Sequence, residues 1–183
     1  KLANEVDELE VFMEVSSGLS KVLDLNQLYK KIVEYATKNL GFDSGEVYLL
    51  NKDSTVSLKQ SFYSNYTHLT QSEEHFNDLF KSDEHKQKLL QEIVTSGQPV
   101  VMNEIGEHST EDKSVYLIHP IREEGKVAAF LEVGYASRNK KIADKEIEKL
   151  KIFINTVELA FTTVRLFVGL EEKVRQRTAQ LNK

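Results

Sequence analysis

Apolar positions change their spacing along this chain, and each change marks a predicted element. Spacings of three and four residues predict helices over residues 2–17, 25–40, 84–96 and from about 142 to the end. Short apolar runs rich in β-branched residues predict strands over residues 46–50, 56–62, 99–102, 115–121 and 126–135. The last two strands are nearly continuous in hydrophobicity, which is typical of strands that are covered on both faces.

Capping and turn residues set the bounds of these elements. Asp24 or Asn26 is a suitable N-cap for the second helix, and Gly41 follows its end. Gly18 is expected to end the first helix, and residues 123–125 form a connection of hairpin length between the last two strands. The order of elements predicts an α+β fold: a mainly antiparallel sheet of five or six strands, helices on both faces, and long N- and C-terminal helices.

Both terminal helices carry apolar seams near heptad spacing. We assign to a dimer and signalling face Leu2, Val6, Leu9, Met13, Val157, Val164, Phe167, Leu170, Val174 and Leu181. Arg177 occupies a seam position and weakens a coil locally. Two chains could bury these seams as a parallel homodimer; alternatively, the first helix packs only on the last helix of its own chain.

The C-terminal seam is still in phase where the sequence stops, so we expect this chain to be a piece of a longer protein. We divide it into an N-terminal coiled-coil-like helix (1–20), a central domain (21–163) and a truncated C-terminal signalling helix (164–183).

Composition excludes several classes of protein. Hydrophobic residues make up 40% and charged residues 29% of the chain, with a net charge of −5, as in ordinary soluble domains. No uninterrupted apolar run approaches the ~20 residues of a membrane span, so we expect no direct membrane insertion. The basic residues near the C-terminus alternate with acids, which argues against nucleic-acid binding. The chain has no cysteine, which fits a cytoplasmic location.

Catalytic chemistry is poorly supported. The sequence has no glycine-rich phosphate loop, no nucleophile elbow and no His-Glu-x-x-His helix. Four of the five histidines lie in a polar, acidic region, at spacings that match no metal-ligand pattern. We therefore predict no catalytic residue and no metal site.

A small set of residues could line a ligand pocket. Polar His119 and Glu132 fall inside the most apolar strands, where an unpaired polar group is costly. His119 could face a ligand or ligate haem, or it could be satisfied by a neighbouring backbone group or by Glu132. Tyr48, Phe62, Tyr116 and Phe130 could line an apolar pocket, or they could be ordinary core residues.

The chain resembles the GAF domain family of sensory modules. Four pieces carry the resemblance, in the family's order: Leu28 and Ile32 ahead of Gly-Phe-Asp-Ser-Gly-Glu-Val-Tyr-Leu-Leu (41–50), then residues 93–101, 117–121 and 125–133. The match covers about residues 22–163. Residues 170–181 are similar to the linker between sensor domains and output modules, which are often histidine kinases and sometimes cyclases.

The resemblance implies a regulatory sensor whose output module lies in the same polypeptide, beyond residue 183, in a two-component system. A small ligand is possible but its identity is unknown, and we predict no cofactor. A cysteine-linked bilin is excluded, and no cyclic-nucleotide motif is recognisable. Two alternatives stay open: a ligand-free structural dimerisation module, and a small enzyme resembling the GAF-fold methionine sulfoxide reductases, which depend on cysteine.

Overall fold

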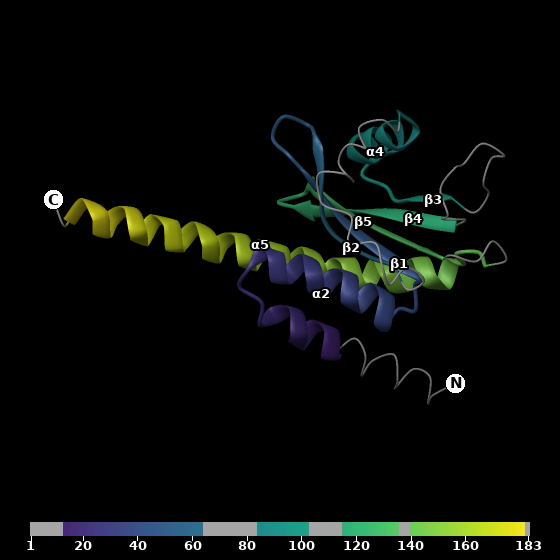
Figure 1. The fold of residues 1–183 in the computed structure, drawn as a ribbon, viewed down its shortest axis with the longest axis horizontal. Helices are drawn as coiled ribbons and strands as arrows, with labels where there is room; N and C mark the ends of the chain where they lie inside the picture. The colour runs from purple at the N-terminus through teal and green to yellow at the C-terminus, as the bar shows by residue number, and fades with distance from the viewer. Residues whose placement is uncertain (1–12, 64–83, 103–114, 136–139, 182–183) are drawn as a thin grey trace.

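The structure is a computed structural model, which describes residues 13–63, 84–102, 115–135 and 140–181. Five strands in these residues form one antiparallel sheet in the order β2-β1-β5-β4-β3. Helix α4 lies on one face of the sheet, while α2 and α5 lie against each other on the other face (Figure 1). The predicted α+β fold with helices on both faces is confirmed.

The strands pair in a register that places β5 at the centre of the sheet. Their bounds are Ser44–Leu50 (β1), Val56–Tyr63 (β2), Val100–Met102 (β3), Val115–Glu123 (β4) and Lys126–Tyr135 (β5). β5 pairs with β1 on one side and with β4 on the other. This position explains the nearly continuous hydrophobicity of β5, because a central strand under helices on both faces has no solvent-facing side.

Local signals mark the start of α2, the turn after it and the β4–β5 hairpin, as the sequence predicted. The carboxylate of Asp24 accepts a hydrogen bond from Gln27 N at 2.9 Å, which caps α2 (Leu25–Lys38). Gly41 then adopts φ +80°, past the helix end. Glu124 and Gly125 both have positive φ between β4 and β5, as a two-residue hairpin turn requires.

The sheet divides the interior into two apolar cores. The larger core lies between the sheet, α2, α5 and the helical segment 13–20. The smaller core lies between the sheet and α4 (Glu84–Ser96), and its buried members are Tyr48, Leu58, Leu90, Ile93, Ile118 and Phe130. Successive residues of a strand point to opposite faces, so each strand contributes alternate side chains to the two cores.

Helix α5 (Asp144–Leu181) crosses the sheet and then continues past the domain (Figure 1). Its side chains packed into the larger core are Leu150, Phe153, Ile154, Val157, Ala160, Phe161 and Val164. An 18-residue window of α5 has a mean hydropathy of 1.4, enough for a membrane span by length and composition alone. We expected no membrane span because the sequence has no long uninterrupted apolar run. The apolar residues of α5 are instead spread over two faces of the helix. A third of the window (33%) is buried inside the domain.

The first helix corrects one expected boundary. The helical segment 13–20 runs through Gly18 instead of ending there. A Cβ on Gly18 would overlap the hydroxyl oxygen of Tyr35 on α2, and Tyr35 would have to shift to admit it. Packing against α2, rather than a helix stop, accounts for this glycine. Residues 1–12, and the irregular helix expected at 73–80, lie outside the described residues.

Candidate functional site

A group of polar and aromatic side chains gathers on the face of the sheet that α4 covers. Glu46 and Tyr48 alternate along β1, and they lie directly opposite Glu132 and Phe130 on β5. Both carboxylates are therefore brought to the same place by strand register. Glu46 is fully buried and Glu132 is only 2% exposed.

Lys86 reaches this place from the first turn of α4. Its Nζ lies 2.9 Å from Glu132 Oε2 and 3.8 Å from Glu46 Oε2, and it donates to the Tyr48 hydroxyl at 2.9 Å. The Tyr48 hydroxyl in turn donates to Glu46 Oε2 at 2.5 Å. Lys86 Nζ also lies 5.0 Å from the centroid of the Tyr48 ring, within cation–π range. We call Glu46, Tyr48, Lys86 and Glu132 the buried ion cluster.

The other groups of the cluster stabilise the buried positive charge of Lys86. A cation in the first turn of a helix is unfavourable beside the positive end of the helix dipole, and removing it from water costs several kcal/mol. For Lys86, both the unfavourable helix dipole and the loss of water are offset by the two carboxylates, the phenol oxygen and the ring face of Tyr48. Chemically the site recognises an ammonium group, and the ammonium present belongs to α4 itself. The cluster thus fastens the start of α4 to β1 and β5.

Glu46 and Lys86 are not among the site residues predicted from the sequence. Glu46 becomes significant only once β1 is aligned opposite Glu132 on β5, and no local pattern reveals that register. Lys86 lies in a polar stretch where a solvated lysine is the ordinary expectation. A basic residue one helical turn ahead of the apolar positions Leu89 and Leu90 was the only available signal.

The predicted pocket residues divide between the two faces. Tyr48, Tyr116, Phe130 and Glu132 lie on the α4 face, as their pairing and alternation require. Phe62 lies opposite Gly45, whose position packs against α2, and Phe62 is 45% exposed.

His119 lies on the opposite face from Tyr116 and Glu132 because it alternates with Ile118 along β4. It is 6% exposed, and its Nδ1 lies 2.8 Å from the carbonyl oxygen of Pro120. A carbonyl only accepts, so Nδ1 carries the proton and donates. Burial is the main cause that lowers the pKa of His119, and the positive charges of Arg122 and Lys151 lower it further, against the hydrogen bond to Pro120, which raises it.

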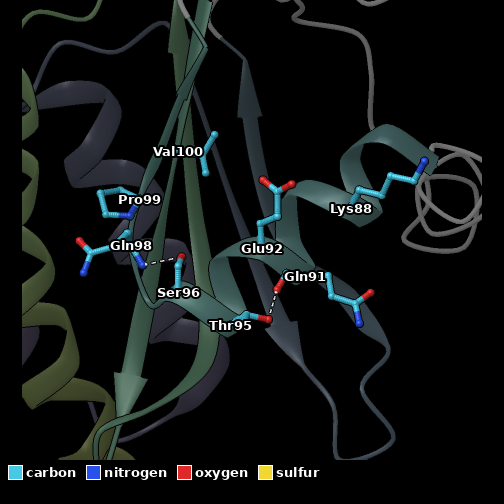
Figure 2. Close-up of a pocket in the computed structure, with 8 residues that line it drawn as sticks. All are labelled: Lys88, Gln91, Glu92, Thr95, Ser96, Gln98, Pro99 and Val100. Atoms are coloured by element: carbon cyan, nitrogen blue, oxygen red, sulfur yellow. Dashed lines mark hydrogen bonds between the residues drawn. The ribbon is translucent and has the colours of Figure 1, made fainter.

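An open hollow lies on the outer side of α4, next to the edge strand β3. It has a volume of about 650 Å³ and is lined by Lys88, Gln91, Glu92, Thr95, Ser96, Gln98, Pro99 and Val100. Figure 2 shows these side chains along α4 and at the corner into β3, where Gln98 N donates to Ser96 Oγ at 3.1 Å. In the part of the chain that the structure describes, no group of three or more His, Asp or Glu residues could hold a metal ion.

A second apolar surface runs along α5, away from its buried side. We call it the outer stripe; its residues are Ile152, Leu159, Leu166, Leu170, Val174 and Leu181. Each of these six side chains is at least 50% exposed. At 100° per residue they lie along one line of the helix, roughly opposite to the residues that contact the sheet.

The outer stripe corrects the predicted seam in part. Val157 and Val164 are both 0% exposed because they pack into the larger core of their own chain, so neither belongs to an exposed face. Phe167 is partly buried, whereas Met13 is 63% exposed. Leu2, Val6 and Leu9 lie outside the described residues.

Comparison with known proteins gives a consistent assignment. The sequence matches the model of the family described as GAF domain over residues 22–162. The structure is similar to the GAF domain of a proposed sensor histidine kinase from Pseudomonas syringae pv. tomato, at 13% identity and a TM-score of 0.65, covering 93% of this chain and 96% of that chain.

Two further solved structures are similar in fold. They are residues 122 to 287 of a methyl-accepting chemotaxis protein (15% identity, TM-score 0.62, 86% of this chain and 99% of that chain) and the GAF domain of an Acinetobacter phosphoenolpyruvate-protein phosphotransferase (13%, 0.64, 86% and 94%). No curated protein matches the sequence. At these identities the structural likeness shows the fold alone.

Proposed function

This chain belongs to the GAF domain family, and on that premise we propose that it works as a homodimer whose paired α5 helices carry a signal to an output module. Family membership makes it a regulatory sensor module of a signalling protein. The further steps proposed are the pairing of α5, a small ligand on the α4 face, and a cytoplasmic histidine kinase as the output in the same polypeptide.

The outer stripe is the observation that carries the proposal. Burying an exposed Leu or Val side chain is worth ~1.5–3 kcal/mol, so six such residues on one line are unfavourable in water. Ile152, Leu159 and Leu166 recur at seven-residue spacing, which suits a parallel pairing in which equal positions meet across a two-fold axis. A second copy of α5 is therefore the occupant that fits this surface.

The opposite side of the same helix explains how a signal would reach the dimer. Phe153, Val157 and Phe161 pack in the larger core, directly under the sheet. A ligand that favours one arrangement of the sheet and its helices would shift the balance between two poses of α5. The candidate ligand surface includes the partly exposed Tyr116, next to the buried ion cluster on the α4 face.

The named outputs of similar proteins support the role of an input domain. A proposed sensor histidine kinase, a methyl-accepting chemotaxis protein and a phosphoenolpyruvate-protein phosphotransferase each carry a domain of this fold. The histidine kinase is the output that the linker-like residues 170–181 favour. We propose no cofactor, and no cysteine is available to attach a bilin.

A ligand-free structural dimerisation module is the second candidate. It is favoured by the filling of the α4 face: Leu90, Ile93, Ile118 and Phe130 are all at most 3% exposed, and Lys86 occupies the space between the carboxylates. The two candidates share the dimer and differ in whether any small molecule raises the melting temperature. A screen of organic amines, carboxylates and nucleotides by thermal denaturation separates them.

Sedimentation equilibrium at micromolar concentration tests the dimer. The unmodified chain should sediment at twice its mass of 21.0 kDa, and Leu166→Glu combined with Leu170→Glu should give the monomer. Val168→Glu is the matched control, because Val168 is also apolar and 42% exposed but lies on the other side of α5. A monomeric parent chain, or equal dissociation by the control, would refute the pairing along the outer stripe.

A further inference from the structure

We propose that Arg122 is the residue through which movement of α4 reaches α5 across the sheet. This inference rests on the proposed function, since it names the route by which the α4 face would regulate the output helix. Arg122 lies at the end of β4, where the register with β5 shifts between Ile121 and Arg122. It contacts a helix on each face of the sheet.

The side chain of Arg122 holds the C-terminal end of α4. Its Nη2 donates a hydrogen bond to the carbonyl oxygen of Gly97, the residue that follows α4. Carbonyl groups at a helix C-terminus lack partners within the helix and carry partial negative charge, so a guanidinium is well suited to bind there. Gly97 N donates back to Ile93 O at 2.8 Å, which ties the same corner to the apolar residues of α4.

A side chain on Gly97 would crowd this contact. Its φ is +66°, a conformation that glycine adopts without strain. A Cβ placed on Gly97 would lie 3.1 Å from Arg122 Nη2, closer than most real contacts of this kind. The backbone conformation of Gly97 and the lack of a side chain there thus both allow the guanidinium to approach its carbonyl.

The backbone of Arg122 holds α5 on the opposite face. Arg122 N donates to Glu158 Oε1 at 2.7 Å. The next residue, Glu123, lies 3.6 Å from Arg165 on α5, seven residues after Glu158 and on the same side of the helix. Glu158 lies between Val157 and Leu159, at the border between the buried face and the outer stripe. The end of β4 is therefore fastened to α5 at two points.

These contacts form a continuous path between the two faces. Lys86 fastens the start of α4 to β1 and β5, and Arg122 fastens its end to β4. A tilt of α4 about the buried ion cluster would displace the carbonyl of Gly97, and with it Arg122. Glu158 would then move because it accepts from the backbone of the same residue. Arg122 acts as a positioning residue, not as a ligand contact.

Hydrogen exchange of the complete chain, followed by mass spectrometry, tests this path with Arg122→Gln. This variant keeps the backbone N–H that binds Glu158 and removes only the contact to Gly97. Coupling predicts exchange in α5 over residues 152–166 that is about fivefold faster, the effect expected for one lost hydrogen bond. Lys126→Gln is the control, since it removes an equal charge from an exposed position of the same hairpin.

Helix α2 serves as the internal reference, because it packs in the same core as α5 but takes no part in the hydrogen bonds of Arg122 with Gly97 and Glu158. Faster exchange in α5 relative to α2 supports the coupling even if the variant is less stable overall. Faster exchange confined to residues 93–102, or equal in α2 and α5, would overturn it. Exchange in α5 and α2 can be compared in a monomer or in a dimer. A negative result would therefore refute the coupling through Arg122 without refuting the proposed dimer.

Discussion

Replacing Lys86 by methionine should destabilise the domain strongly. Methionine keeps much of the side-chain volume but removes the ammonium that lies 2.9 Å from Glu132 and 3.8 Å from Glu46. Removing one partner of a buried ion pair typically costs ~3–5 kcal/mol, because the remaining charge stays in a poorly solvated place. For a chain of this size that corresponds to a melting temperature lower by about 6–20 °C.

Lys88→Met is the matched control for this prediction. Lys88 is exposed, two residues further along α4, and its loss should change the free energy of unfolding by no more than ~0.5 kcal/mol. Urea denaturation followed by circular dichroism measures both variants. A double-mutant cycle adds Glu132→Gln, and the losses should be less than additive because the two residues contact each other. If Lys86→Met were no more destabilising than Lys88→Met, the cluster would not fasten α4.

The acid side of the pH profile should depend on His119, because burial lowers its pKa in the fold. Below pH ~6.5 the unfolded chain binds a proton at His119 that the folded chain excludes. The free energy of unfolding should therefore fall between pH 7.5 and 5.5, and it should fall less in His119→Gln. Equal slopes of the free energy of unfolding against pH in the two proteins would contradict this. Gly18→Ala should destabilise by ~1–3 kcal/mol through the clash with Tyr35, although alanine is the better helix former. Gly169→Ala should instead stabilise by up to ~1 kcal/mol, because a Cβ there would meet no atom within 4 Å apart from its own stretch of helix. Thermal denaturation measures both variants, and stabilisation by Gly18→Ala would show that Tyr35 simply moves aside.

The features that could be predicted from sequence depend on short stretches of chain. Asp24 caps α2 with an atom three residues from its partner, and the turn at Glu124 and Gly125 needs only two residues with positive φ. The continuous hydrophobicity of β5 likewise reports its central place without reference to any other segment. Such signals survive because the physical cause and the residue that shows it lie close together in the chain.

The buried ion cluster could not be predicted because its causes are far apart in the sequence. Glu46 and Glu132 meet through the register of β1 on β5, and a shift by one residue would send each to the other face. Gly18 gave a misleading local signal for the same reason. Glycine is a common helix terminator, but here its cause is the hydroxyl of Tyr35 on another helix.

The seam on α5 shows how a helix with two apolar sides misleads a search for one. Val157 and Val164 are seven residues apart, as are Leu159 and Leu166, so spacing alone cannot tell the core face from the outer stripe. The two sides differ only because the sheet covers the side that carries Val157 and Val164. The consequence is mechanical: between residues 150 and 166 the same turns of α5 fill the core of the domain on one side and expose the outer stripe on the other. A rigid helix cannot rotate one side without the other, and repacking under the sheet would therefore reorient the stripe that we propose holds the dimer together.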